Sequence, residues 1–105
     1  MEIKNVAVIG GGTMGNGIAH VFAMNGFDVN IVEIKQELAD RAIGSINKNL
    51  DRQVKRELIS KEDKDKILKR IIPVIGAENT PNDVDLVIEA IVEEKEVKLD
   101  LFNIL

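Results

Sequence analysis

The sequence contains no cysteine, tryptophan or tyrosine, and only one histidine and three phenylalanines. The absence of cysteine excludes disulfides, thiolate metal sites and a cysteine nucleophile, and one histidine cannot form a multi-histidine metal site. Scarce aromatic side chains and a net charge of −4 argue against nucleic-acid binding, which uses stacking platforms and basic surfaces. We therefore expect neither a nucleic acid nor a metal ion as a partner.

Long apolar runs are also missing. No run approaches the roughly 20 residues needed to span a bilayer. Met1 stands only a few residues before the first apolar segment, which leaves no room for a signal peptide. We therefore expect a cytoplasmic protein with no membrane partner. The 105 residues, 45% of them hydrophobic, are enough for one domain with a small core.

The most informative feature present is a glycine cluster that directly follows a short β-type run at residues 6–9. The pattern G-x-G-x-x-G falls on Gly10, Gly12 and Gly15, and a helix-like stretch begins there. In a dinucleotide-binding loop the first glycine permits the tight turn, the second leaves space for a pyrophosphate, and the third allows close packing of helix on sheet. The free N–H groups at the helix start then hold the diphosphate without a lysine.

An acidic residue completes this pattern. Glu33 ends a second apolar run about 20 residues after the loop, where a carboxylate accepts hydrogen bonds from the adenosine ribose. The same charge repels the 2′-phosphate of NADP. No arginine follows at once, and only Lys35 is near. The pattern predicts NAD rather than NADP, whereas a glycine-rich turn without a ligand would not require the acid.

The remaining chain predicts alternating strands and helices. Pro73 cannot donate to a ladder and places its strand at a sheet edge, while Ser60 and Asp63 resemble a capping box at a helix start. Apolar residues repeat every four positions in the long helical region, at Leu38, Ala42, Ile46, Leu50 and Val54. The predicted strands are residues 4–9, 28–33, 71–76 and 85–92, and the predicted helices are 13–25, 37–58, 60–70 and 93–105.

This order predicts an α/β fold, a Rossmann-type doubly wound parallel sheet in strand order 3-2-1-4. It would be incomplete, with about four strands, and would carry a helical hairpin between strands two and three. We expect residues 1–105 to form one partial NAD-binding domain. Strand four would lack its outer neighbour, so we expect a homo-oligomer with strand four or the last helix at the contact.

Essentially all 105 residues resemble the 3-hydroxyacyl-CoA dehydrogenase family, which includes the bacterial 3-hydroxybutyryl-CoA dehydrogenases. Residues 10–19, Gly-Gly-Gly-Thr-Met-Gly-Asn-Gly-Ile-Ala, are similar to its glycine loop. Residues 85–93, Asp-Leu-Val-Ile-Glu-Ala-Ile-Val-Glu, are similar to its fourth strand, and residues 95–105 to the helix beyond. The resemblance implies oxidation of an L-3-hydroxyacyl-CoA to the 3-ketoacyl-CoA with NAD+, or the reverse reduction in butanoate-forming pathways.

The resemblance also implies roles for single residues. Asn49 and Arg56 match positions that contact the CoA part of the substrate, where the family often has serine and lysine. The family's catalytic histidine and glutamate, and its helical dimerisation domain, come after residue 105. We therefore expect no catalytic residue in this chain and no activity from it alone. The residues assigned to the cofactor are Gly10, Gly12, Thr13, Met14, Gly15 and Glu33, with Ala90, Glu93 and Lys98 at its nicotinamide end.

Several alternatives stay open at this point. The chain could be a stand-alone NAD-responsive regulatory module, or belong to another NAD-dependent family with the same loop, although the helical insert argues against the latter. His20 fits an ordinary helix residue, and Lys98 fits an ion-pair partner of Glu94. A basic helical face could hold CoA phosphates or simply be solvated; it comprises Lys48, Arg52, Lys55 and Arg56.

Overall fold

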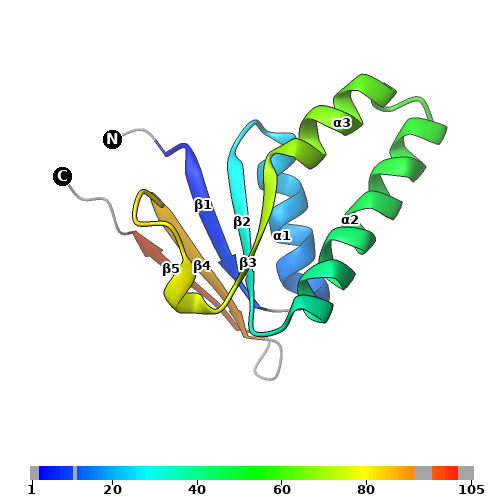
Figure 1. Ribbon diagram of the computed structural model, residues 1–105. Coiled ribbons are helices and arrows are strands. Elements are labelled where there is room, and N and C mark those ends of the chain that lie inside the picture. Colours follow the sequence, from blue (N-terminus) through cyan, green and yellow to red (C-terminus); the bar gives the residue numbers. More distant parts are fainter. Residues whose placement is uncertain (1–2, 11, 92–95, 102–105) are drawn as a thin grey trace.

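The computed structural model describes residues 3–10, 12–91 and 96–101, which form one mixed β-sheet with helices (Figure 1). The sheet has the order β3-β2-β1-β4-β5. Its strands are β1 (Asn5–Ile9), β2 (Asp28–Glu33), β3 (Ile71–Ile75), β4 (Leu86–Ile91) and β5 (Glu96–Leu101). The helices are α1 (Gly12–Met24), α2 (Gln36–Lys55) and α3 (Lys61–Lys69), with a 3₁₀ turn η1 (Ala77–Asn79).

The first four strands confirm the predicted Rossmann-type parallel sheet in the order 3-2-1-4, although the described helices cover only one of its faces. The four strands are all parallel, and β1 lies between β2 and β4. Pro73 lies in β3 and pairs with Ile31 of β2. β3 is an edge strand, as expected because proline has no backbone N–H to donate to a further strand. The carboxyl ends of β1, β2 and β4 therefore meet at one edge of the sheet, where ligands of such folds bind.

The helix predicted for residues 93–105 is wrong. Residues 96–101 form β5, which pairs antiparallel with β4 in a register that places Lys98 opposite Glu89. The sequence Glu-Val-Lys-Leu-Asp-Leu alternates polar and apolar residues with the period of a strand. The outer edge of β4 also offers backbone groups that need partners. The expected exposed edge at strand four is therefore covered by the same chain.

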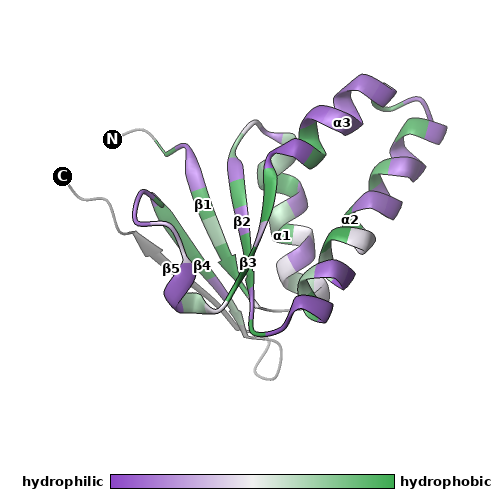
Figure 2. Cartoon of the chain, in the orientation of Figure 1, coloured by the Kyte–Doolittle hydropathy of each residue, from purple (hydrophilic) through white to green (hydrophobic). Residues whose placement is uncertain are grey.

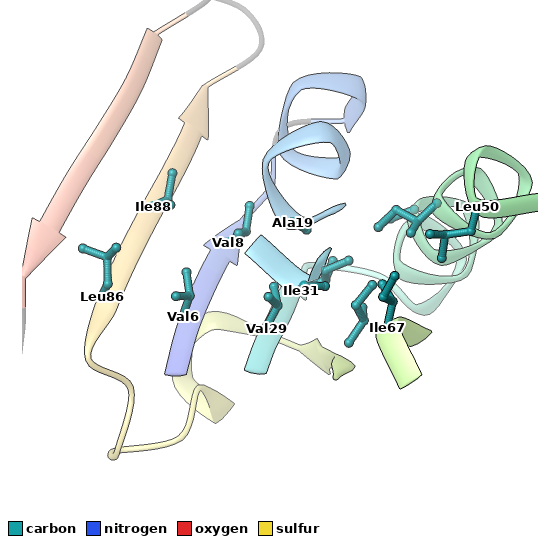
Figure 3. Close-up of a cluster of buried hydrophobic side chains, with 13 residues drawn as sticks. Val6, Val8, Ala19, Val29, Ile31, Leu50, Ile67, Leu86 and Ile88 are labelled. Carbon is teal, nitrogen blue, oxygen red and sulfur yellow. The ribbon is translucent and has the colours of Figure 1, made fainter. Parts of the chain in front are cut away.

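The main hydrophobic core lies between the sheet and the three helices, which all cover one face (Figure 1). Small residues on α1, Ala19 and Ala23, let that helix approach the sheet closely. Figure 3 shows side chains from β1, β2 and β4 pointing toward the helices. The predicted stripe on α2 is confirmed at Ala42, Ile46 and Leu50, which are buried, whereas Leu38 and Val54 are half-buried.

The hairpin between β2 and β3 is confirmed as α2 and α3. A complete capping box begins α3: the Ser60 hydroxyl accepts from the Asp63 N–H, and the Asp63 carboxylate accepts from the Ser60 N–H. An ion pair between Lys64 and Asp51 links the two helices. Figure 2 shows α3 as mostly hydrophilic and β4 as mostly hydrophobic, consistent with a solvated hairpin on a buried sheet. Within the described part of the chain, no helix is long and apolar enough to cross a membrane.

Candidate cofactor-binding site

The glycine loop connects the carboxyl end of β1 to the start of α1. Gly10 and Gly12 have φ angles of +63° and +49°, in the left-handed region that glycine adopts at little cost. The Gly10 N–H donates to the Val32 carbonyl oxygen at 2.9 Å, which joins the loop to the end of β2. The chain therefore leaves β1 in the tight turn that the spacing predicted.

Gly15 marks the point where the helix and the loop come closest. A Cβ at Gly15 would lie 2.1 Å from the Gly10 carbonyl oxygen, far inside van der Waals contact. By contrast, a Cβ at Gly17, on the same helix, would meet nothing within 4 Å. Gly15 is thus required by close packing, whereas Gly17 is not.

Glu33 lies at the carboxyl end of β2 and is 8% exposed. Burial raises the pKa of its carboxyl above the ordinary value of 4.5, because desolvation disfavours the charged form. Its own carbonyl oxygen accepts from the Gly76 N–H at 2.8 Å, which fixes the backbone here. Ribose hydroxyls that donate to this carboxylate would compensate for the water it lacks.

A pocket of about 240 Å³ joins Glu33 to the glycine loop, and it is lined by Gly12, Asn16, Glu33, Leu38, Arg41 and Ala42. The sequence analysis did not assign Asn16 or Arg41 to the site. Helical spacing could have found Arg41, because it follows Leu38 by three residues, which places the two on the same side of α2. The pocket has a carboxylate, a cation and an apolar wall, which suits an adenosine.

The predicted nicotinamide end of the site is partly described. Ala90 is 5% exposed near the end of β4, and its carbonyl oxygen would lie 3.9 Å from a Cβ at Gly10. Ala90 is therefore brought to the glycine loop. Lys98 lies in β5 rather than on a helix, and Glu93 lies outside the described residues.

The two residues assigned to CoA lie apart from this pocket. Asn49 is exposed on α2, where its Oδ1 accepts from Arg52 Nη1 at 3.3 Å, and Arg56 is exposed just after the helix ends. With a rise of about 1.5 Å per residue, Arg56 is about 22 Å along the helix from Arg41. Any ligand that contacts both regions would have to be long.

His20 lies on the buried side of α1 and is 8% exposed. Its Nε2 has no hydrogen-bond partner among the residues that the structure describes. Nothing in the described ranges groups three or more potential metal ligands. His20 is therefore packed within the helical layer, as expected of an ordinary helix residue.

Comparison with known proteins identifies this architecture. Residues 5–105 match the family model described as "3-hydroxyacyl-CoA dehydrogenase, NAD binding domain". A 3-hydroxybutyryl-CoA dehydrogenase of Bradyrhizobium diazoefficiens is 45% identical over 96% of this chain and 34% of its own length. A 3-hydroxyadipyl-CoA dehydrogenase of Escherichia coli is 43% identical over 97% of this chain and 21% of its own length.

Solved structures agree with this result. The 3-hydroxybutyryl-CoA dehydrogenase of Escherichia coli K12 superimposes with a TM-score of 0.79 and 42% identity, over 85% of this chain and 19% of that one. The (S)-3-hydroxybutyryl-CoA dehydrogenase of Ralstonia eutropha gives a TM-score of 0.80 with 35% identity, over 85% of this chain and 31% of that one. This chain thus spans about a fifth to a third of the length of these relatives. It belongs to the 3-hydroxyacyl-CoA dehydrogenase family and carries the family's NAD-binding domain.

Proposed function

We propose that this chain is the NAD-binding part of a dehydrogenase that oxidises an L-3-hydroxyacyl-CoA to the 3-ketoacyl-CoA, or catalyses the reverse reduction. The observation that carries the proposal is the pocket in which Glu33 and the glycine loop meet at the carboxyl edge of the sheet. The names of the relatives from Bradyrhizobium diazoefficiens and Escherichia coli support the substrate class, since both name CoA thioesters of 3-hydroxy acids.

The order of the strands gives the cofactor a direction. We place the adenosine ribose at Glu33, at the end of β2, and the diphosphate over the start of α1 at Gly12, Thr13 and Met14. The nicotinamide would then extend past Gly10 toward β4, because β1 lies between β2 and β4. Ala90, Glu93 and Lys98 belong to that end of the cofactor in this proposal, the last two on the resemblance alone.

In this proposal the chemistry also needs groups that the described residues do not supply. Bound NAD+ would accept a hydride from C3 of the substrate, and a base must take the hydroxyl proton within hydrogen-bond reach. The histidine of this chain is 8% exposed within the helical layer, so it does not offer such a base. We propose that the histidine–glutamate pair of the family supplies it from outside this chain.

The exposed helical hairpin would contribute to substrate binding. Asn49 and Arg56 lie on or next to α2, far from the adenosine pocket, where the phosphates and adenosine of a CoA could reach them from solvent. We further propose a homo-oligomeric, cytoplasmic enzyme that takes part in butanoate metabolism.

A titration combined with an assay tests the proposal. NADH should bind the protein, and NADPH should bind much more weakly. The protein that carries this chain should reduce NAD+ in the presence of L-3-hydroxybutyryl-CoA. Glu33→Ala should raise the KM for NAD+ while leaving kcat nearly unchanged, because Glu33 contacts the ribose and not the reacting carbon. NADH binding without any turnover of acyl-CoA substrates would instead favour a regulatory module.

A further inference from the structure

The adenosine pocket is lined by one arginine, Arg41, which plays no part in the proposed binding of NAD. Arg41 lines it together with Glu33 and Gly12, and it comes from the second turn of α2. Its side chain is exposed, whereas Glu33 is 8% exposed. No ion pair joins Arg41 to Glu33 in the described part of the chain. Arg41 therefore shares the lining of this pocket with Glu33 without an ion pair between the two.

A guanidinium in that position has a specific chemical use. Its planar set of N–H donors matches the oxygens of a phosphate, and the 2′-phosphate of NADP extends from the same ribose that Glu33 would bind. We propose that Arg41 is a latent ligand for the 2′-phosphate, and that Glu33 alone excludes NADP from this pocket. This inference rests on the proposed function, since it assumes that the pocket holds the adenosine of NAD.

The other nearby cation does not serve equally well. Lys35 stands two residues after Glu33, at the N-cap of α2, and it is exposed. It is not among the residues that line the pocket, whereas Arg41 is. Lys35 is also a single point charge without the paired donors of arginine. The two cations therefore provide a matched pair for a test, one inside the pocket and one beside it.

The test compares Glu33→Ser, Glu33→Ser/Arg41→Met and Glu33→Ser/Lys35→Met with the unmodified protein. The ligands are NADH and NADPH, together with adenosine 5′-monophosphate and adenosine 2′,5′-bisphosphate, which differ only in the 2′-phosphate. Glu33→Ser should bind NADPH and the bisphosphate more than about tenfold tighter than the unmodified protein, because the repulsion by Glu33 is lost and one charge-assisted contact to Arg41 is gained. Adding Arg41→Met to Glu33→Ser should weaken bisphosphate binding about tenfold, down to the gain that comes from removing the Glu33 charge alone, whereas adding Lys35→Met should weaken it little.

Two results would overturn the inference while leaving the proposed function intact. One is bisphosphate binding that is equally tight in Glu33→Ser and in Glu33→Ser/Arg41→Met. The other is the absence of any gain in Glu33→Ser, with circular dichroism showing that the variant is folded. Failure of the unmodified protein to bind NADH would refute the proposed function instead. Weaker bisphosphate binding at high salt in Glu33→Ser, but not in Glu33→Ser/Arg41→Met, would confirm the charge of Arg41 as the cause.

Discussion

Two helix starts in this molecule are built in opposite ways. The first turn of α3 contains Glu62 and Asp63, and a complete capping box satisfies two of its N–H groups. The first turn of α1 contains no acidic residue and starts at a glycine. Every helix start has unpaired N–H groups and a partial positive charge. The chain thus neutralises the start of α3 with its own side chains and leaves the start of α1 for an anion.

The acid at α3 shows what the ligand would do at α1. Hydrogen bonds from the backbone and side chain of Ser60 lower the pKa of Asp63 below its ordinary value of 3.8. A carboxylate is therefore stabilised where the helix start is positive. The diphosphate of NAD would lie at the start of α1 as the Asp63 carboxylate lies at the start of α3, but it would be bound reversibly.

Of the substitutions near these two helix starts, Gly15→Ala should have the largest effect on stability and NADH binding. The added Cβ would overlap the Gly10 carbonyl oxygen, so either the loop or the helix must move. We expect a loss of about 2–3 kcal/mol in unfolding free energy, typical of overpacking, and loss of NADH binding. Urea unfolding and fluorescence titration would measure both.

Gly17→Ala is the matched control for this change. Its Cβ would meet nothing within 4 Å, so the variant should gain up to about 1 kcal/mol from helix propensity and keep NADH affinity. Equal behaviour of the two variants would contradict a specific role for Gly15.

The second effect comes from giving α1 the acid that α3 already has. Thr13 is the exposed second residue of α1, so Thr13→Asp should stabilise the free protein by about 0.5 kcal/mol. The same charge would repel the diphosphate and weaken NADH binding about tenfold. Thr13→Asn, which has the shape of aspartate without its charge, should weaken NADH binding much less than Thr13→Asp does. Calorimetry on both variants would show whether stability and binding move in opposite directions.

Local patterns predicted the parts of the site that short segments determine. Gly10 and Gly12 have positive φ angles that favour glycine, Gly15 leaves no room for a Cβ, and the spacing of the three carries that information. The capping box at Ser60 and the edge position of Pro73 also follow from single residues with one physical use. Each was predictable because the constraint acts within a few residues.

Tertiary context decided the rest. The apolar residues near the end of the chain fit both helical and strand spacing, and the available edge of β4 selects the strand. Arg41 lines the adenosine pocket because α2 begins directly after β2, so the first turns of α2 lie close to the glycine loop. Neither the strand edge nor the pocket exists until distant segments have packed.

The third effect tests the capped start. Ser60→Ala removes the hydroxyl that accepts from the Asp63 N–H at 3.0 Å, and it should cost about 1 kcal/mol of unfolding free energy. NADH affinity should not change, because Ser60 lies at the hairpin and away from the adenosine pocket. Thermal unfolding with and without NADH would check both. A fall in NADH affinity would mean that the two helix starts are coupled.

The smallest effect concerns Glu33, the acid that stands apart from both helix starts. Burial raises its pKa above 4.5 in the folded protein, so the native state holds this proton more tightly than the unfolded state does. The stability from this group is therefore fully present below pH 4.5 and is lost as the pH rises through the folded pKa. Glu33→Gln should be more stable than the unmodified protein at neutral pH when NADH is absent. That difference should close as the pH falls through the folded pKa and below 4.5, where the Glu33 carboxyl is protonated in both the folded and the unfolded state.

NADH should reverse the stability order of these two proteins, because in the proposed binding mode the ionised carboxylate would accept from the ribose hydroxyls and the amide would replace it poorly. Thermal unfolding across this pH range, with and without NADH, measures both differences. Glu37→Gln, an exposed change in the first turn of α2, serves as the control and should show no gain at neutral pH. A Glu33→Gln variant that is less stable than the unmodified protein at neutral pH without NADH would show that the carboxylate has a stabilising partner in the free protein.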